Sequence, residues 1–319
     1  MEALKLTAPC KDYLWGGTKL KTEYHQQSSA QKLAESWELS CHEDGLSVIA
    51  EGESAGLTLK EYIDRTGRGV LGTDCDKFEQ FPILVKLIDA KDRLSVQVHP
   101  NNEYALKNEG GYGKTEMWYV VESEPDASLY YGFEKQISKE EFEQRIQNNT
   151  LLEVLHKAEV HPGDVFFIES GTLHAIGAGI LVAEIQQSSN STYRIYDYGR
   201  IGTDGKPREL HIAKALDVTK LEPSPARPLN KAEAFDGYSR TLLASCEYFT
   251  VYEMELTTKA EMNADSTSFH SILCLDGEAA LWNGEKQLTS IEKGGSVFVP
   301  AGMGKYTIKG DCKILFTRV

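Results

Sequence analysis

Most of the chain alternates short apolar runs with turns that contain glycine. The clearest pair is an apolar run at 82–88, a polar turn at 89–92 and a second apolar run at 94–98. Runs of this length, rich in β-branched and aromatic residues, predict strands. Further strands are predicted at 116–122, 165–168, 179–186, 249–256, 271–274 and 296–299. Many short strands joined by tight turns favour a sandwich or a barrel.

Helical signals are few. Thr58 and Ser138 each precede a glutamate by three positions, the S/T-x-x-E pattern that caps a helix N-terminus. The second pattern predicts a helix that runs to about residue 156, and a further helix is expected over 209–218. A Pro-rich stretch at 223–228 is the best candidate for a domain boundary. The chain is therefore expected to be mainly β with a few short helices.

Two segments resemble each other at a constant offset. Residues 163–174 align with residues 294–305, an offset of 294 − 163 = 131 positions, and each has an apolar strand, a small turn with glycine and a new element. Such a repeat predicts two related β modules, which we place at residues 1–234 and 235–319. Lys305 stands in the second copy where His174 stands in the first, so a metal site in the first module is not expected in the second.

Composition narrows the possible partners. Hydrophobic residues make up 41% and charged residues 26%, an ordinary balance for a globular protein. The net charge is −14 and there is no basic stripe, so no nucleic-acid partner is expected. No apolar run approaches the ~20 residues of a membrane span, and the start of the chain lacks signal-peptide character, so we expect a cytoplasmic protein with no membrane partner. The six cysteines form no CxxC pair and are expected to be reduced thiols.

Polar side chains share one face of the predicted strand at 94–98. Alternate residues of a strand point to the same side, so Ser95, Gln97 and His99 face one way and the apolar residues face the other. If the polar face lines the mouth of a barrel, Gln97 and His99 can reach one ion. A lone histidine at a strand end is more often a hydrogen-bonded structural residue, so this strand alone leaves both interpretations open.

Two more polar clusters could complete a metal site. A Gly-rich loop brings Lys114 and Glu116 to one face at the start of a strand, and His174 follows a tight turn. With Gln97 and His99, these residues offer two histidines, one glutamate and one glutamine, a plausible nitrogen and oxygen set for Zn²⁺. Softer metals are less expected because no Cys or Met joins the set. Three such clusters on successive β elements favour a site over three unrelated structural residues.

A fourth cluster follows in the chain. Glu184 and Gln186 share a face of the strand at 179–186, and Arg194 comes soon after it. A solvated strand face and an ordinary surface charge explain these residues as well as a site does. The acidic surface argues only weakly against an anionic ligand, because salt screens distant charges over a length of ~8 Å, so a few Lys and Arg residues beside the ligand can dominate.

Taken together, the motifs resemble the type I phosphomannose isomerases in their short bacterial form. The matching segments are Trp15-Gly16-Gly17, Glu35-Ser36-Trp37, Gln97-Val98-His99-Pro100, Gly113-Lys114-Thr115-Glu116, Gly171-Thr172-Leu173-His174-Ala175, and the ten-residue step from Glu184 to Arg194. The resemblance implies two cupin-type jelly-roll β modules and one Zn²⁺ per chain. The implied metal ligands are Gln97, His99, Glu116 and His174; the implied catalytic residues are Arg194 and Glu184; the implied substrate-binding residues are Lys86, Ser95 and Lys114.

The activity implied by this resemblance is the reversible isomerisation of mannose 6-phosphate and fructose 6-phosphate. Zinc would assist proton transfer between C1 and C2 through a cis-enediol, and the partner would be a small sugar phosphate bound by a monomer or weak homodimer. Two alternatives stay open: a metal-dependent cupin oxygenase and a non-catalytic sugar-binding cupin. Lys86, Lys114 and Arg194 suit a phosphorylated substrate better than the apolar aromatic substrate of an oxygenase. The non-catalytic alternative predicts no exchange of the C2 proton with solvent.

Overall fold

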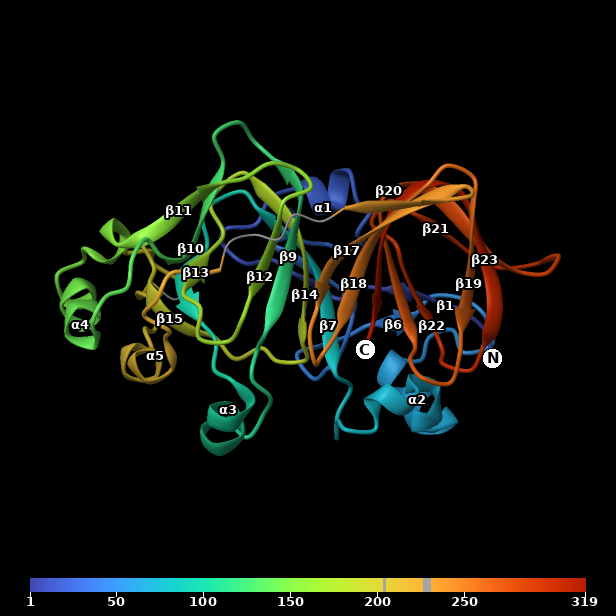
Figure 1. Ribbon diagram of the computed structural model, residues 1–319, viewed down its shortest axis with the longest axis horizontal. Coiled ribbons are helices and arrows are strands. Elements are labelled where there is room, and N and C mark those ends of the chain that lie inside the picture. Colours follow the sequence, from blue (N-terminus) through green and yellow to red (C-terminus); the bar gives the residue numbers. More distant parts are fainter. Residues whose placement is uncertain (203–204, 226–230) are drawn as a thin grey trace. The chain divides into compact units, whose positions relative to one another are not determined.

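The computed structural model describes residues 1–202, 205–225 and 231–319 (Figure 1). The chain folds into two compact units. The first comprises Met1–Lys11, Thr18–Leu87 and Pro228–Val319, and the second comprises Asp12–Gly17 and Ile88–Arg227. Both are built mainly from strands, with a few short helices (Figure 1), as the sequence predicts.

The first unit joins the two ends of the chain. Its N-terminal elements are β1 (Leu4–Thr7), β2 (Cys10–Lys11), α1 (Lys19–Thr22), β3 (Glu35–Leu39), β4 (Cys41–His42), β5 (Gly45–Leu46), β6 (Val48–Ile49), α2 (Leu59–Thr66), and the 3-10 turns Arg68–Leu71 and Thr73–Cys75. Its C-terminal elements are β16 (Ala232–Phe235), β17 (Tyr238–Ser245), β18 (Thr250–Leu256), β19 (Lys259–Ala264), β20 (His270–Asn283), β21 (Lys286–Glu292), β22 (Ser296–Val299) and β23 (Gly304–Arg318). Within the described ranges, one antiparallel sheet runs β16-β17-β18-β23-β20-β22-β1-β6, with β19 on β23 and β21 on β20.

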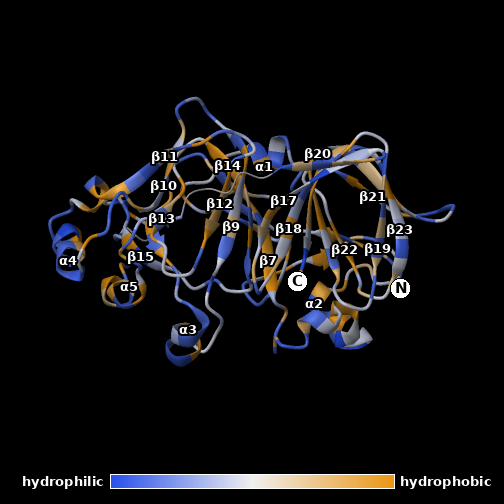
Figure 2. Ribbon diagram, in the orientation of Figure 1, coloured by the Kyte–Doolittle hydropathy of each residue, from blue (hydrophilic) through white to orange (hydrophobic). Residues whose placement is uncertain are grey.

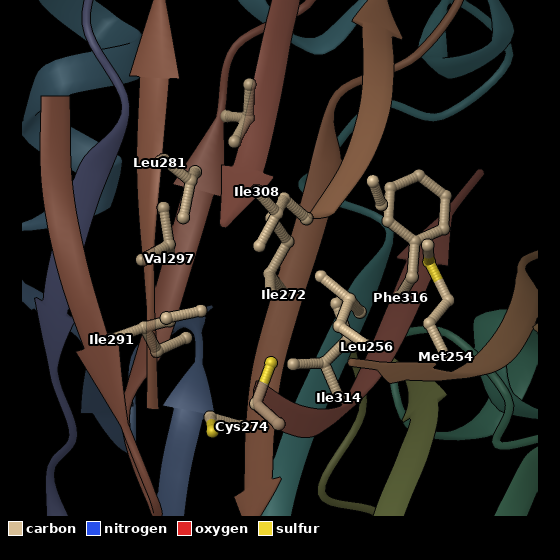
Figure 3. Close-up of a cluster of buried hydrophobic side chains, with 14 of the residues drawn as sticks. Met254, Leu256, Ile272, Cys274, Leu281, Ile291, Val297, Ile308, Ile314 and Phe316 are labelled. Carbon is tan, nitrogen blue, oxygen red and sulfur yellow. The ribbon is translucent and has the colours of Figure 1, made fainter. Parts of the chain in front are cut away.

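A cluster of buried apolar side chains packs between the strands of this sheet. Figure 3 shows side chains from several of its strands pointing toward one another, among them Ile272, Cys274, Val297, Ile314 and Phe316. Alternate residues of these strands point inward, which is the period-2 pattern of a half-buried sheet. Burial of these apolar side chains stabilises the packing of the long strands β20 and β23.

The units divide the chain differently from the predicted domains at 1–234 and 235–319. Leu4 of β1 pairs with Phe298 of β22, so the N-terminal strand lies in the sheet of the C-terminal segment. Strand β7 (Ile83–Ala90) runs from the first unit into the second. The predicted domains describe sequence modules and stay a prediction. The Pro-rich stretch at 223–228 lies partly outside the described residues, which stop at 225 and resume at 231.

The second unit contains the predicted polar clusters. Its elements are β8 (Val96–Val98), α3 (Asn102–Asn108), β9 (Glu116–Ser123), β10 (Ser128–Phe133), α4 (Lys139–Gln147), the 3-10 turn Leu151–Glu153, β11 (Leu155–Glu159), β12 (Val165–Ile168), β13 (His174–Ala175), β14 (Ile180–Gln187), β15 (Tyr193–Tyr196) and α5 (Ile212–Val218). Among the described residues, one sheet runs β11-β10-β13-β8-β15, and β9 pairs with β12 on one side and β14 on the other. Val96 and Val98 pack in the core with Leu173 and Phe142, which confirms the predicted apolar face of the strand at 94–98.

The helix signals give one correct prediction and one that is partly wrong. Thr58 and Glu61 form the full capping box of α2. Ser138 caps α4 by accepting from the backbone N–H of Glu141, but the helix ends at Gln147 and not near residue 156. The segment 155–159 is strand β11 instead, because it pairs with β10. A tertiary pairing of this kind has no local signal in the sequence.

The internal repeat is visible in the backbone. Strand β12 at 165–168 and strand β22 at 296–299 keep the offset seen in the sequence. Gly163 and Gly294, which precede these strands, both have positive φ, and so do Gly171 and Gly302 in the turns that follow. Left-handed φ angles are accessible to glycine at little cost, so both copies use glycine at the same two turns for the same reason.

Hydropathy separates the buried strands from the outer helices. In Figure 2, β7 and β14 are largely apolar, whereas α3 and α4 are mostly polar. Every residue of β7 and β14 is buried, and strands buried on both faces read as near-continuous apolar runs. In the described part of the chain, no helix has the length and apolar character of a membrane span. All six cysteines are free thiols, as predicted.

Candidate metal centre and active site

The candidate site is built on two rows of cross-strand neighbours in the second unit. In one sheet, His174 of β13 stands opposite Gln97 of β8, which in turn stands opposite Arg194 of β15. In the other, Glu116 of β9 stands opposite Gln186 of β14. Paired residues present their side chains to the same face of a sheet. Sheet register therefore brings together residues from four separate predicted clusters.

His99, Glu116 and His174 form a compact cluster where the two rows meet. One ligand atom from each residue lies within 4.8 Å of the others. The Glu116 Oε2 atom is 3.7 Å from His99 Nε2, and Oε1 is 3.4 Å from His174 Nε2. Two ligands bound at ~2.1 Å to one tetrahedral ion are about 3.4 Å apart. The three side chains are buried, and their spacing fits one divalent ion.

Hydrogen bonds fix the protonation of both histidines. His99 Nδ1 lies 2.8 Å from the Ser191 carbonyl, and His174 Nδ1 lies 2.9 Å from the Thr172 carbonyl. A carbonyl can only accept, so each Nδ1 carries a proton, and in the neutral imidazole the Nε2 on the side of Glu116 then carries the lone pair. Burial lowers the pKa of His174 to about 4. Both features are those of histidine ligands whose second nitrogen is held by a backbone carbonyl.

Lys114 joins the cluster to a second carboxylate. Its Nζ is 2.6 Å from Glu116 Oε2 and 3.6 Å from Glu184 Oε1. It also lies 3.3 Å from His99 Nε2. Lys114, Glu116 and Glu184 are all buried. One ammonium between two buried carboxylates offsets their mutual repulsion in a medium of low dielectric.

Trp118 is a site residue that the sequence reasoning missed. Its indole Nε1 donates to Glu184 Oε2 at 2.8 Å, and its ring meets the His174 ring edge-on, with centroids 5.2 Å apart. The available signals were its spacing of two from Glu116 on the same strand face and the polar N–H of a buried tryptophan. An aromatic residue in an apolar strand reads as core, and only the pairing of β9 with β14 reveals its second role.

Arg194, Ser95 and Gln97 are linked by side-chain contacts beside the cluster. Arg194 donates from Nε to Ser95 Oγ at 3.3 Å and from Nη1 to the Glu209 carbonyl at 3.0 Å, while Ser95 Oγ lies 3.5 Å from Gln97 Oε1. Gln97 Nε2 is 3.5 Å from His174 Nε2, which places this amide at the edge of the cluster. Burial, followed by the nearby Arg208 charge, lowers the pKa of Arg194.

Lys86 belongs to the first unit, where it is buried. Its Nζ lies 3.6 Å from Glu35 Oε2 and 5.0 Å from the centroid of the Trp37 ring. The Trp37 indole donates to the same glutamate oxygen at 2.8 Å. The segment Glu35-Ser36-Trp37, noted in the sequence, is thus the partner of this lysine.

Two close backbone approaches hold the ligand segments together. A Cβ atom on Gly113 would lie 2.4 Å from the carbonyl carbon of Asn101, so only glycine fits there. The next residue, Lys114, donates its N–H to the Pro100 carbonyl at 3.0 Å. Gly171 donates its N–H to the His99 carbonyl at 2.8 Å. The loop before Glu116 and the turn before His174 are therefore both fastened to the segment that carries His99.

Known proteins resemble this chain over its whole length. Residues 3–131 match the model of the phosphomannose isomerase type I catalytic domain, and residues 239–319 match that of the mannose-6-phosphate isomerase cupin domain. The mannose-6-phosphate isomerase ManA of Bacillus subtilis is 37% identical over 97% of this chain and 96% of its own length. The chain belongs to the type I phosphomannose isomerase family. Another relative, the mannose-6-phosphate isomerase of Streptococcus mutans, is 36% identical over 98% of this chain and 97% of its own length.

Solved structures of phosphomannose isomerases agree with the fold. The mannose 6-phosphate isomerase of Bacillus subtilis superposes with a TM-score of 0.94 at 34% identity and covers 100% of both chains. A putative mannosephosphate isomerase of Archaeoglobus fulgidus, 22% identical, has the same fold with a TM-score of 0.74 over 99% of this chain and 97% of its own. The predicted mainly β fold with cupin modules is confirmed.

Family membership also confirms the predicted enzyme class, an isomerase, over the oxygenase and the non-catalytic binding protein. The cluster of His99, Glu116 and His174 is compatible with a metal ion. The choice of zinc, the role of Gln97 as a ligand and the catalytic and substrate-binding assignments stay predictions. So do the cytoplasmic location and the monomer or weak homodimer.

Proposed function

We propose that this phosphomannose isomerase interconverts mannose 6-phosphate and fructose 6-phosphate beside a Zn²⁺ ion held by Gln97, His99, Glu116 and His174. The observation that carries the proposal is the buried cluster in which two histidine Nε2 atoms face one carboxylate at 3.4 and 3.7 Å. Nitrogen and oxygen donors without thiolate or thioether suit zinc. When bound, the metal would act as a Lewis acid that stabilises negative charge on the reacting oxygens.

Glu184 is proposed as the base that moves the proton between C1 and C2. The reaction passes through a cis-enediol, so one group on one face of the sugar can remove and return the proton. Trp118 orients the Glu184 carboxylate by donating to Oε2 at 2.8 Å, and Lys114 lies 3.6 Å from Oε1. A base held in this way is preorganised for proton transfer.

Arg194, Ser95 and Lys114 are proposed to bind the substrate and the charge that develops on it. A phosphate monoester carries about −1.5 to −2 charges near pH 7, which the overall charge of −14 would repel. Arg194 is half-buried and linked to Ser95 at 3.3 Å, so its guanidinium is held next to the row of Gln97 and His174. We assign Arg194 a catalytic role in stabilising the enediolate and not only a binding role.

Lys86 is proposed as a further cation for the sugar phosphate. Its burial with Glu35 and Trp37 keeps the ammonium in one place, and a point charge of this kind suits phosphate. Its contribution is expected in KM more than in kcat.

A coupled assay with mannose 6-phosphate tests the proposal directly. We expect formation of fructose 6-phosphate, loss of activity after treatment with a chelator and recovery on addition of Zn²⁺. In ²H₂O, the C2 proton should exchange into solvent and no oxygen should be consumed. Full activity in protein shown to be metal-free would overturn the role of the metal, and binding of the sugar phosphate without proton exchange would overturn the catalytic assignment.

A further inference from the structure

Gln186 is a buried glutamine whose amide is fixed in one orientation. Its Nε2 donates to the Gln187 carbonyl at 2.7 Å and to the Ser189 carbonyl at 2.6 Å. Carbonyls only accept, so the amide nitrogen must face them and the amide cannot be flipped. Gln186 also stands opposite Glu116 in the register of β14 and β9. Its side chain therefore lies on the face that carries the metal cluster.

A short series of hydrogen bonds leads from this amide to His99. The Ser189 carbonyl is held by Gln186, and the Ser189 hydroxyl accepts from the Ser191 N–H at 3.3 Å. The Ser191 carbonyl then accepts from His99 Nδ1 at 2.8 Å. That last bond sets the tautomer of His99 and turns its Nε2 toward Glu116.

Strand stability alone does not explain an amide at position 186. The other end of the amide, Oε1, has no hydrogen-bond partner among the described residues, although it is buried. A buried acceptor without a partner destabilises the folded state. An apolar side chain of similar size would avoid that destabilisation. What the amide provides is its pair of donors to the turn at 187–189.

We propose that Gln186 is a positioning residue of the metal centre, which fixes the turn at 187–191 so that the Ser191 carbonyl orients His99 for metal binding. This inference rests on the proposed role of His99 as a ligand. Partners that orient a ligating histidine typically contribute 10–100-fold to metal affinity. Loss of the Gln186 donors should therefore weaken metal binding while leaving every ligand in place.

Gln186→Met removes both donors at similar volume. We expect a Zn²⁺ dissociation constant about 10–100-fold higher than wild type, measured by competition with a chromophoric chelator. The visible absorption bands of the Co²⁺-loaded protein should shift or weaken, because they report the geometry of the ligands. Ser296→Ala is the matched control. Ser296 lies in the first unit, is equally buried and donates to the Glu38 carbonyl at 2.6 Å, so its loss should lower stability and leave metal affinity unchanged.

Ser189→Ala interrupts the same series at its second bond and is the milder variant. If both residues act through the Ser191 carbonyl, the double variant should bind Zn²⁺ no more weakly than Gln186→Met alone. Folded variants with affinities within twofold of wild type, or with fully additive losses, would overturn the inference. If Gln186→Met does not fold, an unchanged affinity in Ser189→Ala overturns it and a weakened one supports it. Wild-type protein that binds no Zn²⁺ would instead defeat the proposed metal centre itself.

Discussion

Gln97 and His174 stand directly opposite each other on β8 and β13, although 77 positions separate them in the chain, and their Nε2 atoms are 3.5 Å apart. The candidate metal cluster is thus a product of sheet pairing and not of one contiguous motif. Gln97 and His174 lie on strands whose apolar residues, such as Val96, Val98 and Ala175, are packed in the core. A ligand can therefore be changed with the strands still in place, which makes metal affinity and folding separable in experiments.

Glu116→Gln should abolish tight metal binding. Glu116 is the residue that faces both histidines, through its two oxygens, and an amide replaces its charge with a neutral group. We expect the metal content after dialysis to fall well below one equivalent and kcat to fall by at least about 10². Metal analysis and the coupled assay provide the two readouts. Glu124→Gln is the control, because Glu124 is half exposed and pairs with Lys91 at the surface; a full metal complement in Glu116→Gln would contradict the assignment.

Gly113→Ala should damage the site without touching a ligand. The added Cβ would lie 2.4 Å from the backbone of Asn101, so the loop that carries Lys114 and Glu116 must move away from the segment after His99. We expect weaker metal binding and a loss of about 1–3 kcal/mol in stability, as for other overpacked positions. Gly111→Ala serves as the control, because a Cβ there has no atom within 4 Å. Equal behaviour of the two variants in chelator competition would argue against this role for Gly113.

Glu184→Gln should lower kcat by about 10² or more while the metal content holds. The glutamine amide has nearly the size of the carboxylate, and its oxygen can still accept from the Trp118 indole. The fold around β9 and β14 should therefore persist. What disappears is the capacity to take a proton. Single-turnover kinetics with C2-deuterated mannose 6-phosphate provide the measurement. Near-normal turnover would remove Glu184 from the role of base and favour a metal-bound water in its place.

Arg194→Lys should reduce kcat as well as raise KM. Lysine keeps the charge but cannot reproduce the fork that contacts Ser95 and the Glu209 carbonyl together. Loss of transition-state stabilisation lowers kcat, whereas loss of ground-state binding raises KM. We expect a decrease of about 10²-fold or more in kcat. A change confined to KM would reduce Arg194 to a binding residue.

Strand periodicity predicted much of the fold because its signals are local. Alternation correctly placed Gln97 and His99 on one face of the strand at 94–98, and the runs at 165–168 and 296–299 match β12 and β22 at both ends. In each case one face of the strand is buried, so apolar residues occupy the positions that face the core, and this is visible in the sequence alone.

Features that depend on pairing between distant segments were not predictable in this way. The helix predicted from Ser138 was extended to about residue 156, into the start of β11, because only the pairing with β10 marks that segment as a strand. The hydrogen bond from Trp118 to Glu184 depends on the register of β9 and β14. The partner of Lys86 is Glu35, whose strand is remote in the sequence. Motif resemblance predicts which residues form the site, whereas strand register determines what each of them contacts.

Glu38 should make stability depend on pH. Its carboxyl is buried on β3, where Ser36 Oγ donates to Oε1 at 2.6 Å. Burial raises the pKa to about 8, because it disfavours the charged form more than the bond from Ser36 favours it. The folded state therefore binds more protons than the unfolded state between pH 4.5 and about pH 8. The contribution of this group to stability is complete below that window and is lost as the pH rises through the folded pKa.

The window from pH 6.5 to 8 contains most of the change expected from Glu38. The pKa values of His174, His270, His42 and His211 are lowered from 6.5, so these groups act mainly below the window and in the opposite direction. At about 1.4 kcal/mol per pH unit, the unfolding free energy should fall by roughly 2 kcal/mol across the window. Urea denaturation at both pH values provides the measurement. Glu38→Gln keeps the acceptor for Ser36 but cannot ionise, so its stability should change much less over the same range, and an equal decline in both proteins would show that another group is responsible.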